Sequence, residues 1–148
     1  MVGFVQFAAI LCRKGTTTDI KDASRIGKAA MLCFTKRFYA AEQVPRIHLA
    51  YYGLVAFHAV PLQSCAEMLW QGFQTGMSLG DSSVAFANSI AHTNTLLLAG
   101  ENLHTLLKRA DYYLELTDQY KNKLSKTYLL CLRDTISVLI DKGESTSS

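Results

Sequence analysis

The chain has no lysine or arginine between Ile47 and Leu107, and this stretch limits what the chain can fold into. The stretch contains two runs without any charged residue, Ile47 to Ala66 and Ser82 to Gly100. Segments this apolar must be covered by neighbouring helices, by a lipid bilayer or by a partner protein.

The bilayer is disfavoured because a membrane-spanning helix needs about 20 consecutive apolar residues. Pro61 interrupts the first run, which also contains His48 and His58, and the second run contains His92 among asparagines and threonines. Pieces this short or this polar are typical of inner helices buried against their neighbours. We therefore expect no membrane segment, and membrane association through these runs is kept as an alternative.

The helix-breaking residues predict an all-α fold of about seven helices in antiparallel hairpins, and no strand pattern competes with it. We expect one helical-repeat domain over 1–142 and a disordered tail over 143–148, after Gly143. The predicted helices run from near Met1 to Cys12 or Arg13, from Thr17 or Thr18 through Phe34, from about Val44 to Val60, from Pro61 to Gly80, from Asp81 or Ser82 to Gly100, from Asn102 through Leu114, and roughly from Gln119 to Ile140.

Two corners follow one pattern, in which a glycine precedes a helix-capping residue and then an alanine within the new helix. They are Gly15 to Ala23 and Gly80 to Ala85. Repeated helix pairs with such corners are typical of an α-solenoid. The full tetratricopeptide signature W-x2-L-G-x2-Y is absent, since Trp70 is followed by Gln-Gly-Phe. Any repeats are therefore degenerate.

The charge and the cysteine content indicate which class of partner is excluded and where in the cell we expect the protein. The net charge is +3, which gives no dense basic face for a nucleic acid. The four cysteines, at positions 12, 33, 65 and 131, form no C-x-x-C pair and indicate a reducing, cytoplasmic location.

No catalytic, cofactor or metal motif is present, so we predict a protein that is not an enzyme and uses no cofactor. The chain lacks the G-x-S-x-G elbow, the phosphate-binding G-x-x-x-x-G-K-[ST] loop, the G-x-G-x-x-G turn and the H-x-x-x-H pair. A small helical enzyme or ligand carrier that uses His92, His104 and Asp111 is the alternative.

Aromatic side chains are the best candidates for partner binding, because exposed aromatic anchors dominate many interfaces. We expect most of the aromatic side chains to pack in the core. We predict that Tyr52, Trp70 and Tyr112 are the exposed ones. The predicted partner is a protein or a segment of the same chain, with no small-molecule substrate.

Several short motifs occur in order along the chain: Ala29 and Ala30 in a capped helix, Arg46 before the aromatic helix, Pro61-Leu62, Gln74-Thr75-Gly76, Gly80-Asp81 with Ala85, Gly100-Glu101-Asn102-Leu103 and Asp111-Tyr112-Tyr113. Over about Thr18 to Leu139 this arrangement resembles the tetratricopeptide-like helical region of large multidomain signalling proteins. In that family the region follows a protein-kinase-like domain and an AAA-related signal-transducing ATPase domain, and precedes sensor and histidine-kinase or cyclase modules. The resemblance implies a non-enzymatic regulatory piece of a larger protein, and it transfers no catalytic residue.

Overall fold

A computed structural model describes residues 2–14, 16–37 and 40–146. These residues form seven α-helices and two short 3-10 helices and contain no strand, so the predicted all-α class is confirmed. The elements are α1 (Val2–Lys14), α2 (Thr17–Arg37), η1 (Ala41–Gln43), α3 (Val44–Leu54), η2 (Ala56–His58), α4 (Leu62–Ser78), α5 (Ser82–Leu98), α6 (Leu103–Gln119) and α7 (Lys123–Thr146).

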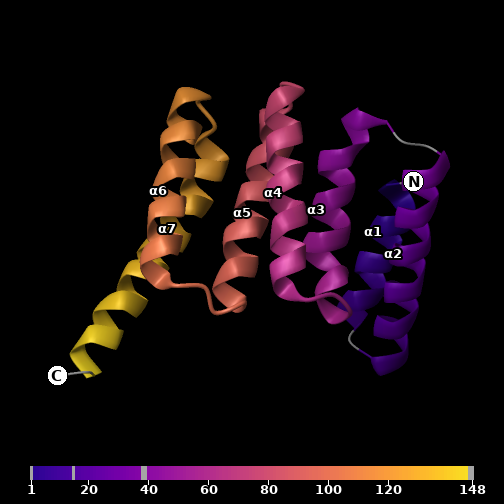
Figure 1. The fold of residues 1–148 in the computed structure, drawn as a ribbon, viewed down its shortest axis with the longest axis horizontal. Coiled ribbons are helices and arrows are strands. Elements are labelled where there is room, and N and C mark those ends of the chain that lie inside the picture. The colour runs from indigo at the N-terminus through magenta and orange to yellow at the C-terminus, as the bar shows by residue number, and fades with distance from the viewer. Residues whose placement is uncertain (1, 15, 38–39, 147–148) are drawn as a thin grey trace.

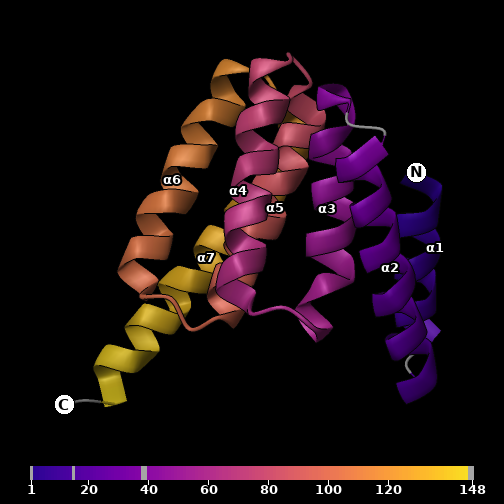
Figure 2. The same cartoon turned by 45° about the vertical axis from the view of Figure 1, so that its right-hand side comes forward.

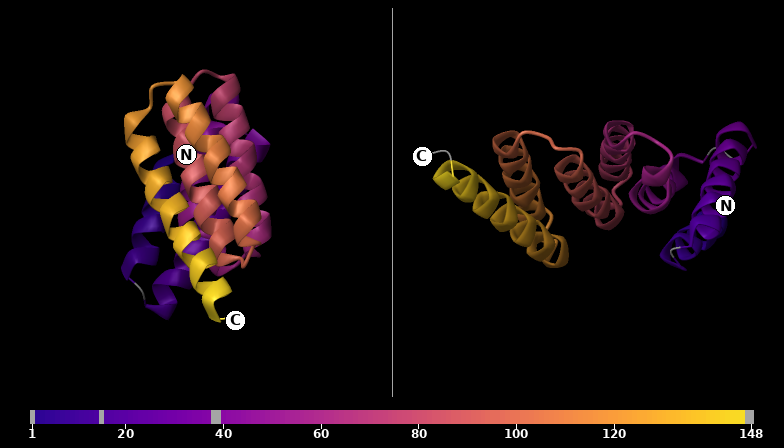
Figure 3. Two further views of the ribbon diagram at one scale, coloured as in Figure 1. Left: turned by 90° about the vertical axis from the view of Figure 1, so that its left-hand side faces the viewer. Right: turned by 90° about the horizontal axis from the view of Figure 1, so that it is seen from below.

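Consecutive helices run in opposite directions and follow one another across the molecule, with the two chain ends at opposite sides (Figures 1 and 3). Each helix packs against the next one. The odd-numbered helices also contact each other, α1 with α3, α3 with α5, and α5 with α7. The backbones of α2, α4 and α6 make no comparable contacts with one another. The odd-numbered helices therefore form a continuous row, and the even-numbered helices are separated from each other.

Three successive helices, α4, α5 and α6, end in the same backbone motif. A residue with positive φ follows each helix, and the next amide donates to the carbonyl oxygen five residues earlier, as in a Schellman motif. Two of these residues are glycines, whereas the third is a lysine. The residues are Gly80 (φ 77°), Gly100 (φ 77°) and Lys121 (φ 53°), and the closing bonds run from Asp81 N to Gly76 O (3.0 Å), from Glu101 N to Leu96 O (3.1 Å) and from Asn122 N to Thr117 O (2.9 Å).

The helix that follows each of these corners begins with a side-chain cap. Asp81 Oδ1 accepts a hydrogen bond from Val84 N at 3.3 Å, which confirms the predicted start of α5. Asn102 caps α6 and Asn122 caps α7 in the same way, each accepting from the amide three residues later. Because the amide donors of a helix start lack partners inside the helix, each cap satisfies one of them.

Two predicted helix boundaries are wrong near the middle and the end of the chain. The helix predicted to reach Val60 stops at Leu54, because Val55 leaves the helical conformation (φ −125°) to pack in the core. The helix predicted to start at Gln119 starts at Lys123, because the segment between them is the Lys121 corner.

Two further corrections concern caps. Thr16, rather than Thr17 or Thr18, caps α2, since its hydroxyl oxygen accepts from Asp19 N at 3.2 Å. The last helix continues past Gly143 to Thr146, because a glycine can keep a helical backbone. Met1, Gly15 and residues 147–148 of the predicted tail lie outside the described residues.

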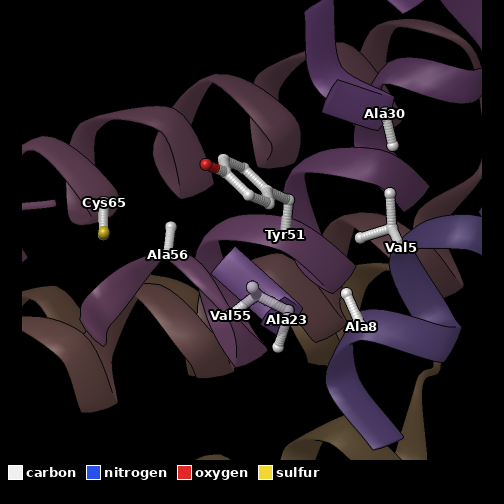
Figure 4. Close-up of a cluster of buried hydrophobic side chains, with 8 residues drawn as sticks. All are labelled: Val5, Ala8, Ala23, Ala30, Tyr51, Val55, Ala56 and Cys65. Carbon is white, nitrogen blue, oxygen red and sulfur yellow. The ribbon is translucent and has the colours of Figure 1, made fainter. Parts of the chain in front are cut away.

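A core of small side chains joins α1, α2, α3 and α4. Tyr51 lies at its centre, and Figure 4 shows its ring among the side chains of the surrounding helices. Alanines let these helices approach closely, because they bury no bulky group between them. The members are Val5, Ala8, Ala23, Ala30, Tyr51, Val55, Ala56 and Cys65.

Helices α4 and α5, which lie side by side in Figures 1 and 2, make the most extensive helix contact of the described residues. Gly76 faces Ala85, and a Cβ atom on Gly76 would lie 2.9 Å from the Ala85 Cβ. One turn earlier, Gly72 faces Asn88. Within the described part of the chain, none of the helices combines the length and apolarity needed to cross a bilayer.

Candidate functional site

An open groove of about 420 Å³ lies between α2 and α4, above α3. We call it the α2–α4 groove. It exists because α2 and α4 both pack on α3 and make no extensive contact with each other. Its lining is mostly apolar, with polar groups at the edges. The lining residues are Lys28, Met31, Leu32 and Thr35 of α2, Tyr51 and Tyr52 of α3, Val60, and Ser64, Glu67 and Met68 of α4.

The floor of the groove is held firmly by aromatic packing. The rings of Tyr51 and Tyr52 meet at 4.9 Å, and Tyr52 also packs edge-on against His48 at 5.4 Å. Tyr51 is buried against Gly27 of α2, where a Cβ atom would lie only 2.8 Å from the Tyr51 ring. Burial raises the pKa of both tyrosine hydroxyls, so both are neutral at physiological pH.

A buried histidine positions the α4 wall. His48 Nδ1 donates to the carbonyl oxygen of Met68 at 2.8 Å, so the tautomer carries its proton on Nδ1. Burial lowers the pKa of His48, although the bond to Met68 partly offsets this shift. The imidazole is therefore neutral at physiological pH and acts as a fixed link between α3 and α4.

The edges of the groove carry opposite charges. Lys28 lies on the α2 side and Glu67 on the α4 side, and both side chains are exposed. The α2 wall also includes Leu32, whose side chain is 51% exposed. An exposed leucine beside a flexible methionine gives a surface that can adapt its shape to an apolar ligand.

The three aromatic residues predicted to bind a partner lie in different surroundings. Tyr52 is half-buried in the floor of the α2–α4 groove. Trp70 is half-buried in a cluster of aromatic rings with Phe73 and Tyr113, which we call the ring cluster. Its ring stacks on that of Phe73, with 5.3 Å between the ring centroids. Tyr112 is 46% exposed on α6 and touches the ring of Tyr113. Of these three residues, Tyr52 is the one that lines the α2–α4 groove.

The ring cluster encloses a hydrogen-bonded histidine. His92 is buried, and its Nδ1 lies 2.8 Å from the Tyr113 hydroxyl. The other ring nitrogen, Nε2, lies 3.4 Å from Arg109 Nη1. Because arginine can only donate, Nε2 must be unprotonated, and Nδ1 donates to Tyr113. Burial, followed by the Arg109 charge, lowers the pKa of His92 to about 4.

The alternative site of His92, His104 and Asp111 does not have the geometry of a catalytic cluster. His92 is engaged with Tyr113, whereas His104 is exposed to solvent. Asp111 accepts a hydrogen bond from Arg133 Nε of α7 at 2.9 Å, in a salt bridge between α6 and α7. Among the residues that the structure describes, no group of three or more His, Cys, Asp or Glu side chains has the arrangement of a metal site.

Sequence reasoning found Tyr52 but missed the rest of the groove. Met31 borders the apolar face of α2, whereas Leu32 lies on the opposite side with Lys28, and Met68 follows Glu67 on a helix that mixes apolar and polar residues. These residues line a groove because α2 and α4 stand apart on α3. No local sequence signal reports that separation, because it depends on how two helices pack on a third.

No protein-family model, curated protein or solved structure matches this chain.

Proposed function

We propose that this chain is a non-enzymatic helical-repeat module of the α-solenoid type, and that its α2–α4 groove binds an amphipathic helical segment of a partner protein. One observation carries the proposal: an adaptable apolar groove lies over a rigid aromatic floor. Grooves of this kind bind the apolar face of a helix through side chains spaced three or four residues apart.

The charges at the groove edges indicate the chemistry of the partner. An acidic residue on one side of the bound helix would face Lys28, and a basic residue on the other side would face Glu67. Charges at the rim contribute more to orientation and association rate than to affinity. Affinity would come from apolar anchors against Leu32 and Met68.

Binding in this groove would regulate the chain through the separation of α2 and α4. The walls belong to α2 and α4, so a helix seated between them fixes their separation, and a ligand that prefers one separation shifts the population toward it. The resemblance to helical regions of large signalling proteins supports a role as a regulatory piece of a longer ATPase or kinase polypeptide. The four unpaired cysteines support a cytoplasmic location.

Selection of displayed helical peptides against the purified chain tests the groove. We expect enriched peptides to carry apolar residues at i, i+4 and i+7 with an acidic flank. The Leu32→Glu variant should bind them at least about tenfold more weakly, because it buries a charge under the apolar anchor. Leu98→Glu is the matched control, since Leu98 is also exposed (76%) but lies at the end of α5.

Two results would overturn the proposal. One is that the enriched peptides bind the wild-type chain and Leu32→Glu equally well. The other is native mass spectrometry showing a small organic molecule bound to the wild-type chain and lost from Leu32→Glu, which would make the groove a ligand site. A peptide that matches another segment of the same polypeptide would identify an internal ligand in place of a separate partner.

A further inference from the structure

Helix α7 carries a continuous row of exposed side chains on the face away from the rest of the molecule. We call this row the outer stripe. Leu124 is 72% exposed, Tyr128 58% and Val138 50%, and the two residues between them in the row are also exposed. The outer stripe consists of Leu124, Tyr128, Cys131, Thr135 and Val138.

The outer stripe is separate from the face that α7 uses within the fold. The buried face contains Leu129 and Ile136, which are both fully buried. Because each helical residue turns by about 100°, Leu129 lies about 140° around the helix from Leu124. The packing of α7 on α5 and α6 therefore does not explain why the outer stripe is apolar.

The spacing of the outer stripe is that of a coiled-coil seam. Its members alternate by four and three residues, which gives the 3.5-residue period that keeps one helix facing another. The C-terminal part of α7 also projects beyond the neighbouring helices (Figures 1 and 2), so a second helix has access to it. The geometry thus favours a helix as the occupant.

The charges beside the outer stripe favour a second copy in the antiparallel direction. Lys123 and Asp141 are exposed on the same flank, at opposite ends of the stripe. In an antiparallel pair equal flanks face each other, so each Lys123 approaches the Asp141 of the other copy. In a parallel pair this flank would face Leu132 and Leu139, which carry no charge.

The residue spacing fits the same arrangement. Leu124 precedes Cys131 by seven residues, and Val138 follows it by seven. An antiparallel pair centred on Cys131 therefore places Leu124 against Val138 of the other copy at both ends of the seam. We propose that two copies of this chain associate through antiparallel packing of their α7 outer stripes, with the two Cys131 side chains facing each other at the twofold axis.

Analytical ultracentrifugation over a concentration series tests the association. We expect a reversible monomer–dimer equilibrium in the wild-type chain. Tyr128→Lys should weaken the dimer by at least about tenfold, because it places two charges in the apolar seam. Leu98→Lys, at an exposed leucine outside the outer stripe, should leave the equilibrium unchanged, and circular dichroism verifies that both variants fold. A chain that stays monomeric at every concentration overturns the proposal.

A charge exchange tests the orientation. Lys123→Asp and Asp141→Lys should each weaken the dimer, since each places like charges together at both ends of the seam. The double variant should restore it, because the pairs are reformed with opposite polarity. Failure of the double variant to recover any affinity overturns the antiparallel arrangement.

Disulfide trapping provides an independent test in a chain with Cys33→Ser and Cys131→Ser, which removes the two exposed cysteines. Leu124→Cys and Val138→Cys are then introduced in separate chains. We expect mild oxidation to cross-link the mixture of the two chains but neither chain alone. Cross-linking of each chain alone indicates a parallel pair, and no cross-linking in the mixture contradicts the seam; either result overturns the proposal.

Discussion

Gly72 of α4 lies directly against the side-chain amide of Asn88 of α5, so closely that a Cβ atom on Gly72 would be 2.5 Å from Asn88 Oδ1. The amide nitrogen of Asn88 donates to the carbonyl oxygens of Pro45 and Val84, both at 2.9 Å. Asn88 therefore links α5 to α3 through a space that exists only because α4 has no side chain at position 72.

We predict that Gly72→Ala destabilises the protein by about 1–3 kcal/mol, because the added methyl group must displace the buried Asn88 amide from its two hydrogen bonds. Urea denaturation measures the change. Gly53→Ala is the matched control. A Cβ atom there would make ordinary contacts, the nearest at 3.6 Å, so the better helix propensity of alanine should leave stability unchanged or raised by up to about 1 kcal/mol. Equal losses in both variants would contradict the close contact.

Lys121 occupies a position where the other two corners have glycine. Its positive φ costs a residue with a Cβ atom about 1 kcal/mol or more, so Lys121→Gly should raise the free energy of unfolding by about 1 kcal/mol. Thermal unfolding followed by circular dichroism detects the change. The reverse substitution, Gly100→Ala, should destabilise by a similar amount although space is open around it. A Lys121→Gly variant less stable than wild type would show that the lysine side chain compensates for the strain.

Stability should fall as pH falls below neutrality, because His92 is buried in its neutral form. Its pKa is about 4 in the folded protein and about 6.5 in an unfolded chain, so between these pH values the unfolded chain binds a proton that the folded chain does not. The free energy of unfolding should drop by up to about 3 kcal/mol between pH 6.5 and 4 from this group. Urea denaturation at pH 7 and pH 5 measures it.

The His92→Gln variant isolates this contribution, since carboxylates and His48 also titrate in acid. The loss of stability between pH 7 and pH 5 should be smaller in His92→Gln than in wild type. His104→Gln, at an exposed histidine, should keep the wild-type loss. Identical losses in wild type and His92→Gln would mean that His92 keeps its ordinary pKa in the folded state.

Asp81 performs two tasks that substitutions can separate. It caps α5, and its Oδ2 pairs with Arg46 Nη2 of α3 at 3.0 Å. Asp81→Asn keeps the cap and loses only a half-exposed ion pair, so we expect a loss below about 1 kcal/mol. Asp81→Ala also removes the cap and should cost about 1 kcal/mol more, measured by urea denaturation. Equal stability of the two variants would indicate that the cap contributes nothing.

The fold was predictable from sequence wherever a helix end has its usual residues. Gly80 with Asp81 and Gly100 with Asn102 mark two corners correctly, because a positive φ favours glycine and an exposed helix start favours a short polar side chain. The Lys121 corner was not predicted because the positive-φ position, which is glycine in the other two corners, is occupied by a lysine. The end of α3 was missed because Val55 is apolar and buried, and a periodic pattern does not distinguish a buried helical residue from a buried kink.

The candidate site was predictable only in part. An aromatic residue such as Tyr52 can be named from sequence as a potential anchor. Whether it lines a groove depends on the distance between α2 and α4, which neither helix encodes alone. Trp70 has the composition of an anchor as well, yet the neighbouring rings of Phe73 and Tyr113 pack around it.

The order of helices along the row has a consequence for how the protein folds. Every substantial contact between described helices joins elements that are adjacent in the chain or one helix apart. No long loop must close before its contacts form, and proteins with such local contacts fold in microseconds to milliseconds. Since α7 packs mainly on α5 and α6, it can detach with little effect on α1 to α3. Amide hydrogen exchange should therefore be faster in α7 than in α4 and α5, which are held on both sides.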